Sequence, residues 1–122
     1  MKLKNEQIFQ YIQALEKCGK ATGFPGMIIA ITREKLIGKI GGYLKEKQRI
    51  FETYGKQEEG EWFIPSSCPS YDEIVNRLRE MGNTETDVDV LQFSENEFIE
   101  KFQNPELTAM DYSILIEIFV RK

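Results

Sequence analysis

The side chains available for chemistry in this sequence are mainly carboxylates and amines, because the chain contains no His and only two Cys. His is the only side chain whose unperturbed titration falls between about pH 5 and 8. Without it, a Ser-His-Asp or Cys-His nucleophile lacks its base, and a zinc site that uses His lacks a ligand. Cys18 and Cys68 belong to no CxxC pair, so an all-Cys zinc site is excluded too. We therefore expect a protein that is not an enzyme and that holds no metal and no cofactor.

Cys68 is a minor candidate nucleophile. It follows Ser66 and Ser67 in a loop before an expected helix, where the helix N-terminus would stabilise a thiolate. Because no His is available as its base, the start of a helix is the simpler explanation of these residues. A disulfide with Cys18 is not expected, because isolated Cys residues without a secretory signal are usually reduced.

Two groups of acidic residues are candidates for binding a partner. Their spacing does not match an EF-hand loop, and a calcium site needs roughly six to eight oxygens from a compact set of ligands. Clustered carboxylates can instead imitate a nucleic acid backbone and occupy a basic protein surface. The plainer interpretation is a solvated acidic surface. The first group is Glu58, Glu59 and Glu61, and the second is Glu85, Asp87 and Asp89.

Basic and aromatic residues alternate in the segment 35–63 and suggest a second kind of site. Basic groups neutralise phosphates and aromatic rings stack on bases, so this composition is typical of a surface for a nucleotide or another small anion. No ribonucleoprotein signature accompanies it, and aromatic residues that alternate on strands are more often core. The candidate contacts are Lys39, Lys45, Arg49, Tyr54 and Trp62.

Three helices are expected to position these residues. Ile8, Ile12 and Leu15 have helical spacing and indicate a helix from about residue 5 to residue 17, with Asn5 placed to cap it. Capping boxes at 70–73 and 94–97 predict two more helices, from about residue 71 to Gly82 and from about residue 95 to residue 103.

Strands are expected elsewhere in the chain. The segments 27–32, 88–93 and 112–120 are rich in β-branched residues, and 49–54 with 61–65 flank a polar loop as a hairpin would. Helical spacing also fits 105–120, and both templates fit 33–46. In the latter, three Gly residues within 38–42 favour a bent strand, since each costs up to about 1 kcal/mol inside a helix. The same glycines suggest a phosphate nest, but a structural bend is the simpler interpretation.

The predicted fold class is α+β in a single globular domain, 1–122. An N-terminal helix precedes an antiparallel β-meander or hairpin, and a helix-strand-helix-strand segment then completes a mixed sheet. The composition, 41% hydrophobic and 30% charged, is that of an ordinary globular protein. The longest apolar stretch, 27–31, is far below the ~20 residues that span a bilayer, so we expect a soluble, cytoplasmic protein that binds no membrane.

The net charge of -4 conceals a division of the chain. Residues 1–56 carry 11 Lys or Arg against 5 Asp or Glu, whereas residues 57–122 carry 5 against 15. Such a division can steer a charged partner or promote a homo-oligomer, unless the fold intermingles the two halves. We expect a small non-enzymatic binding or inhibitor protein of bacterial or phage type that acts on a larger protein partner through a charged surface. The alternative is a protein that sequesters a nucleotide or small anion.

Overall fold

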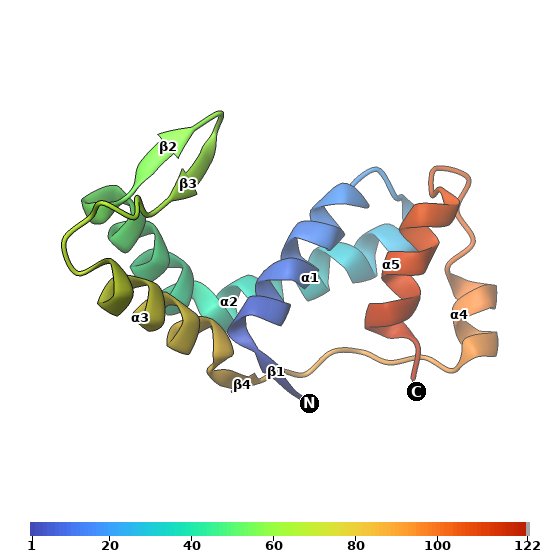
Figure 1. Cartoon of the computed structure of the whole chain (residues 1–122). Helices are drawn as coiled ribbons and strands as arrows, with labels where there is room; N and C mark the ends of the chain where they lie inside the picture. Colours follow the sequence, from blue (N-terminus) through green and yellow to red (C-terminus); the bar gives the residue numbers. More distant parts are fainter. Residues whose placement is uncertain (122) are drawn as a thin grey trace.

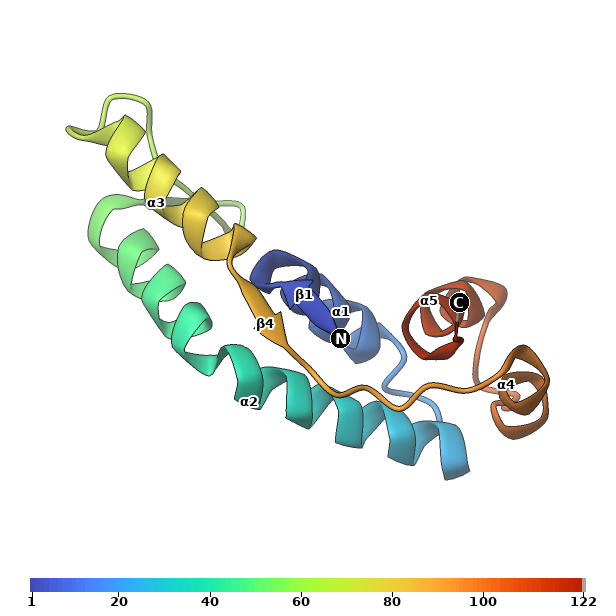
Figure 2. The same ribbon diagram turned by 90° about the horizontal axis from the view of Figure 1, so that it is seen from below.

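The computed structural model describes residues 1–121, and its longest element is a kinked helix, α2, against which other elements pack (Figure 1). Helix α1 runs antiparallel to α2, so Glu6 meets Tyr43 and Glu16 meets Arg33. Helix α3 lies beside the far end of α2, and α4 and α5 lie near its beginning (Figure 2). The helices are α1 (Asn5–Lys17), α2 (Gly23–Tyr54), α3 (Tyr71–Asn83), α4 (Glu95–Lys101) and α5 (Ala109–Phe119).

The strands form two separate antiparallel pairs within residues 1–121. One pair joins the N-terminus to the segment after α3, with Leu3 opposite Thr86. The other is a hairpin between α2 and α3, with Gln57 opposite Trp62. The strands are β1 (Lys2–Lys4), β2 (Lys56–Glu58), β3 (Glu61–Phe63) and β4 (Glu85–Asp87).

The predicted α+β class is confirmed, and so are the N-terminal helix and the helices that follow Ser70 and Ser94. The hairpin is also present, although its strands occupy 56–58 and 61–63 instead of 49–54 and 61–65. A continuous mixed sheet is not formed. The strand predicted at 88–93 is wrong: the segment has no regular secondary structure apart from a single parallel bridge that joins Phe93 to Val120.

The prediction of strands at 27–32, 33–46 and 49–54 is wrong, because all three segments belong to α2. The buried residues of this helix include Ile28, Leu36 and Ile40, which share the face that contacts α1 and the rest of the core. Burying them outweighs the cost of the glycines in 38–42. The expected bend is real but lies inside the helix, where Ile40 has non-helical backbone angles (φ -115, ψ 19). None of residues 38–42 has positive φ, so the segment does not form the predicted nest.

The strand predicted at 112–120 is also wrong, because this segment is α5. Thr108 caps the helix: its hydroxyl accepts a hydrogen bond from the backbone N–H of Asp111 at 3.2 Å, and the Asp111 carboxylate accepts one from the N–H of Thr108 at 2.9 Å. This reciprocal capping box fixes the start of the helix and offsets the weak helix propensity of its β-branched residues.

Aromatic side chains from α2, α4 and α5 meet in one cluster of the core. Phe102 is its centre, with ring centroids 4.5 Å from Phe98, 5.4 Å from Phe93 and 5.6 Å from Phe119. Phe24 in the first turn of α2 closes the cluster, with its ring edge-on to Phe102. Burial of these rings holds the two C-terminal helices on α2.

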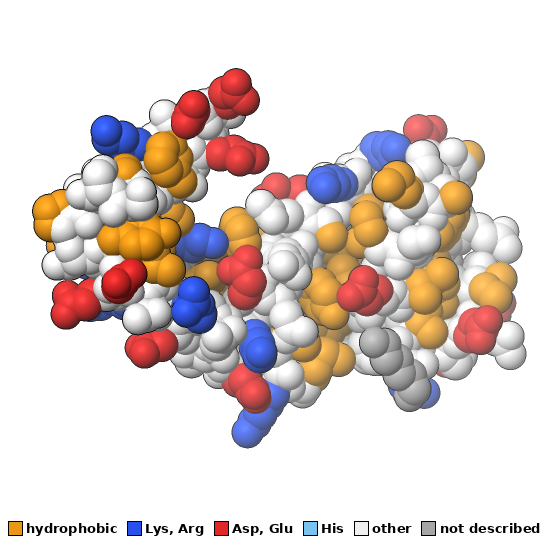
Figure 3. Space-filling model, in the orientation of Figure 1, with side chains coloured by type: hydrophobic (Ala, Val, Ile, Leu, Met, Phe, Trp, Pro, Cys, Tyr) orange, Lys and Arg blue, Asp and Glu red, His pale blue; other side chains and the backbone are white. Residues whose placement is uncertain are grey.

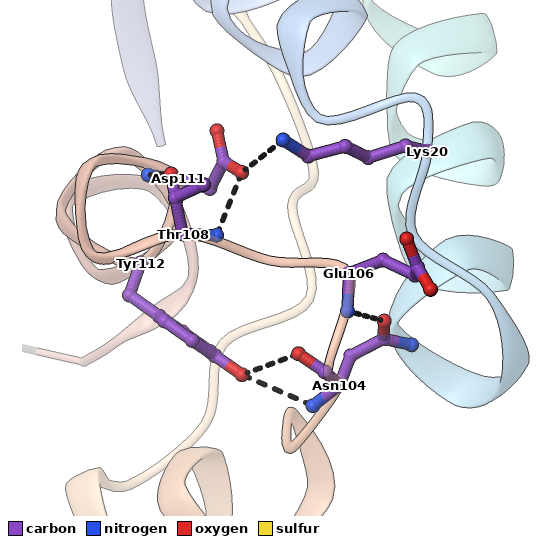
Figure 4. A network of polar contacts seen from close by, with 6 residues as sticks. All are labelled: Lys20, Asn104, Glu106, Thr108, Asp111 and Tyr112. Atoms are coloured by element: carbon purple, nitrogen blue, oxygen red, sulfur yellow. Dashed lines mark hydrogen bonds and ion pairs between the residues drawn. The ribbon is translucent and has the colours of Figure 1, made fainter.

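A polar network fastens the loop before α5 to the loop between α1 and α2 (Figure 4). The Lys20 amine lies 3.4 Å from the Asp111 carboxylate. Tyr112 accepts a hydrogen bond from the backbone N–H of Asn104 at 3.0 Å and donates one to its carbonyl at 3.2 Å. The Asn104 amide in turn donates to the carbonyl of Thr22 at 2.7 Å. These contacts fix α5 relative to the first turn of α2.

Two predicted caps have other roles in the structure. Asn5 lies within α1 and is buried, and its side chain bonds to residues near β4 instead of capping the helix. Ser70 precedes α3 in the left-handed backbone region (φ 63), and its side chain makes no capping bond. Of the two capping boxes predicted from sequence, only the one at Ser94 is formed.

Candidate interaction surface

The β2–β3 hairpin projects from the end of α2 and presents the first predicted acidic group (Figure 1). Its loop is two residues long, and both have positive φ, 52° at Glu59 and 84° at Gly60. A type I′ turn requires this combination, and its twist matches that of the strands on either side. Gly adopts such angles freely, whereas a Glu residue adopts them at a cost.

The three carboxylates at this tip are held close together. Glu58 is directly opposite Glu61 in the strand register, and Glu59 lies in the turn between them. All three are exposed, and within residues 1–121 none of them forms an ion pair. Like charges directly opposite each other destabilise an antiparallel pair. The tip therefore carries negative charge that no ion pair within residues 1–121 neutralises.

Aromatic residues anchor the base of the hairpin. The Trp62 ring lies 6.3 Å from that of Phe51 on α2. Gly55 joins α2 to β2 where the backbone is crowded, because a Cβ there would come within 2.7 Å of the Phe51 carbonyl and 2.8 Å of the Phe63 carbonyl. The hairpin is thus fixed on the helix by packing and by a close backbone approach.

A groove of about 520 Å³ lies under the hairpin, between it, α1 and α2. Figure 3 shows this hollow, with acidic side chains on the projecting hairpin above it. Among its lining residues, the Lys47 amine lies 4.5 Å from the centre of the Phe9 ring and 3.7 Å from the Glu6 carboxylate. The groove is lined by Phe9, Gln13, Leu44, Lys47, Gln48, Phe51, Glu61 and Trp62.

The second predicted acidic group lies elsewhere. Glu85 and Asp87 are on β4 and Asp89 follows it, at the edge of the molecule where the N-terminus lies, away from the hairpin (Figure 1). Asp87 is already paired, with its carboxylate 3.2 Å from the N-terminal amine. The structure therefore does not bring the two acidic groups into one surface.

The residues predicted to bind a nucleotide are divided among three places. Arg49 and Tyr54 line a groove of about 940 Å³ between α2 and α3, whereas Trp62 lines the groove under the hairpin. Lys39 and Lys45 are exposed on α2 and line neither groove.

Arg49, in the groove between α2 and α3, already forms an ion pair within the chain. The Arg49 guanidinium makes two hydrogen bonds to Glu46, at 2.6 and 3.0 Å, and Arg77 reaches the same carboxylate at 3.4 Å. The bonds from Arg49 hold the pKa of Glu46 below its ordinary value, so this carboxylate stays charged and offsets part of the positive charge.

Phe9 and Lys47 are residues of the hairpin groove that the sequence analysis did not select. Tyr43, Lys47 and Phe51 are spaced i, i+4, i+8, which places them along one face once α2 is known to be a helix.

Cys68 shows no catalytic arrangement in the part of the chain described. Its thiol lies 3.3 Å from the carbonyl of Pro69, and the residues around it are turns before α3. Within residues 1–121, no group of three or more Cys, Asp or Glu side chains is arranged to hold a metal ion. None of the helices in that range is both long enough and apolar enough to cross a membrane.

Comparison of the chain with protein-family models, with curated proteins and with solved structures finds no match. The hairpin and its groove are accordingly interpreted from their own geometry and charge.

Proposed function

We propose that this chain is a small non-enzymatic binding protein, of the accessory or inhibitor kind, that engages a larger protein partner through the acidic tip of the β2–β3 hairpin. One observation carries the proposal: three acidic residues are gathered in and directly beside a two-residue turn, although this opposes the stability of the hairpin. Glu58 faces Glu61, and Glu59 occupies a left-handed conformation. Features that oppose local stability are typical of functional sites.

A basic partner surface would relieve the repulsion at this tip. Lys or Arg side chains of a partner would form charge-assisted hydrogen bonds with the carboxylates, and these would make association faster and sensitive to salt. The groove below supplies apolar surface from Phe9, Leu44 and Trp62. An apolar side chain next to the partner's basic residues would fit there.

The test compares two triple variants that remove the same number of charges. Tagged wild-type protein is used to retain its partner from the source cells, and the affinity is then measured with both proteins purified. Glu58→Gln/Glu59→Gln/Glu61→Gln should weaken binding by about tenfold or more and reduce its dependence on salt. Glu85→Gln/Asp87→Asn/Asp89→Asn should change it by less than about threefold.

The hairpin variant should fold at least as stably as the wild type, because it removes like-charge repulsion. Equal loss of binding in the two variants, or unchanged binding in the hairpin variant, would overturn the assignment to this tip. Failure of the wild-type protein to retain any partner would overturn the function itself.

A second candidate function is the binding of a nucleotide or small anion in the groove between α2 and α3. The observation in its favour is that Arg49, Tyr54 and Arg77 line one groove together with polar side chains such as Asn76. A panel of nucleotides and inorganic phosphate, screened by thermal shift, tests it. A shift that Arg49→Gln and Arg77→Gln each abolish would support it, and no shift at millimolar ligand would exclude it.

A further inference from the structure

The outer face of the first half of α2 has no partner within residues 1–121. Met27 and Ile31 lie on this face with exposures of 52% and 46%, although they are large and apolar. Ile29 and Leu36, on the opposite side of the helix, are buried. In Figure 2 the other elements lie on one side of α2 and leave its other side open.

Two exposed glycines follow on this face, Gly38 about two turns beyond Ile31 and Gly42 about three turns beyond it, just after the kink at Ile40. A Cβ built at Gly38 or at Gly42 would meet no atom within 4 Å. Neither has positive φ, because the glycines with positive φ in residues 1–121 are Gly23 and Gly60. The folded chain therefore uses neither the small size nor the conformational freedom of these residues, yet each destabilises a helix by roughly 0.5–1 kcal/mol relative to Ala. Close approach of another backbone is the remaining use for them.

This face of α2 is complementary to the same face of a second copy that runs in the opposite direction. If two copies of α2 are laid antiparallel so that residue n faces residue 69 − n, Met27 faces Gly42 and Ile31 faces Gly38. Glu34 then faces Lys35. Every contact occurs twice, because a two-fold axis passes between residues 34 and 35, as a symmetric dimer requires.

We propose that a second copy of this chain docks on this face of α2 to form an antiparallel, two-fold symmetric dimer. The large apolar side chains of one copy lie over the glycines of the other, which lets the helices approach closely and removes Met27 and Ile31 from water. The face is distinct from the hairpin, so this inference does not depend on the proposed function.

Charge complementarity favours a second copy of this chain as the partner and an antiparallel arrangement of the two helices. Glu34 is exposed and its nearest cation within residues 1–121 is Arg33, at 3.8 Å, while Lys35 is also exposed. An antiparallel pair places Glu34 beside Lys35 of the second copy on both sides of the axis. A parallel pair in the same register would place Glu34 beside Glu34 and Ile31 beside Ile31, which satisfies neither the charges nor the glycines.

The size of the contact sets the strength expected. The segment from Met27 to Gly42 has a length along its axis of about 22 Å at 1.5 Å per residue and bends at Ile40, and one helix pair of that length buries less than the roughly 1,200 Å² of a standard stable interface. We therefore expect a monomer–dimer equilibrium with a dissociation constant in the range of tens to hundreds of micromolar.

The experiment is sedimentation equilibrium of the full chain over about 5 to 500 µM, a range that brackets this constant. The wild type should pass from monomer to dimer. Glu34→Lys and Lys35→Glu should each weaken dimerisation about tenfold, since each puts like charges face to face. The double variant Glu34→Lys/Lys35→Glu should restore it. A wild type that stays monomeric throughout, single variants with no effect, or a double variant that fails to recover would each overturn the proposal.

A steric variant tests the same face without changing charge. Gly38→Leu fills the space that Ile31 of the second copy would occupy, and should abolish the dimer while the melting temperature of the monomer stays the same or rises. Thr53→Leu, at an exposed position near the end of α2, is the matched control and should dimerise as the wild type does. A Gly38→Leu protein that still dimerises normally would exclude this face.

Discussion

Asp111 is a buried carboxylate that combines two contacts at the start of α5. It accepts a hydrogen bond from the backbone N–H of Thr108 at 2.9 Å and lies 3.4 Å from the Lys20 amine. The bond from Thr108 contributes most to holding the pKa of Asp111 below its ordinary value, and Lys20 adds to this. The carboxylate therefore stabilises the fold in its charged form.

This pKa shift predicts a loss of stability in acid. A carboxyl group whose native pKa lies below its unfolded value stabilises the protein above the unfolded value, and the stabilisation is lost as the pH falls through the native value. We expect the free energy of unfolding to fall between pH 7 and pH 3, and to fall less in Asp111→Asn, which is also less stable at pH 7. Urea unfolding at the two pH values measures both quantities.

The exposed Glu106 in the same loop provides the control for this experiment. Glu106→Gln should retain the acid sensitivity of the wild type. If Asp111→Asn lost as much stability in acid as the wild type, the contribution of this carboxylate would be refuted.

Gly38, within α2, and Gly55, directly after it, should respond in opposite ways to substitution by Ala. A Cβ at Gly55 would come within 2.8 Å of two carbonyl oxygens, whereas a Cβ at Gly38 meets open space. We expect Gly55→Ala to destabilise the protein by about 1–3 kcal/mol and Gly38→Ala to stabilise it by about 0.4–1 kcal/mol. Guanidinium unfolding at low micromolar protein concentration measures this in the monomer. Effects of the same sign would contradict the close approach at Gly55.

At the level of elements, the sequence predicts the helices whose apolar stripe or cap is local. Helices α1, α3 and α4 could be found in this way, and so could the hairpin with its Gly-bounded polar loop. The sequence of α5 predicts a strand because Ile114, Ile116, Ile118 and Val120 alternate as on one face of a strand. The local signal for a helix is the capping box from Thr108 to Asp111.

Other elements could not be derived from local pattern. Residues 33–46 of α2 fit two templates, and long-range burial against α1 decides between them. Strands β1 and β4 have three residues each and no alternation of apolar residues, so only their pairing defines them. The acidic tip could be predicted because it lies in one short segment. The groove beneath it could not, because Phe9 and Trp62 come together only through the packing of α1, α2 and the hairpin.

At the level of the whole molecule, Asn5 joins segments that are far apart in the chain. Its side-chain amide donates a hydrogen bond to the Met81 carbonyl at 3.0 Å and its carbonyl oxygen accepts one from the Thr86 hydroxyl at 2.6 Å. Its backbone N–H donates to the carbonyl of Thr84. These bonds hold the start of α1 against the end of α3 and β4.

Asn5→Ala should therefore lower the free energy of unfolding by about 1–3 kcal/mol, because it leaves buried polar groups without partners. Exposed Asn96 on α4 is the matched control, and Asn96→Ala should change stability by less than about 0.5 kcal/mol. Urea unfolding followed by circular dichroism compares the two. Equal effects would show that the buried bonds of Asn5 contribute no more than an exposed side chain.

The division of charge along the sequence is partly balanced by the fold. Lys20 pairs with Asp111, and the N-terminal amine of Met1 pairs with Asp87, so ion pairs join cations of the basic half to carboxylates of the acidic half. The hairpin carboxylates form no ion pair within residues 1–121. Unbalanced negative charge at that tip is thus a property of the structure and not only of the composition.

The irregular backbone at Ile40 divides α2 into two helical parts joined by a bend. The part of the helix before it packs with α4 and α5, the part after it supports α3 and the hairpin, and α1 contacts both parts, through Arg33 before the bend and through Tyr43 and Lys47 after it. From Ile40 to Tyr54 the helix extends about 21 Å at 1.5 Å per residue. By simple trigonometry, a change of about 10° at this joint would move the base of the hairpin by roughly 4 Å, so small changes in core packing around Ile40 would be amplified at the acidic tip.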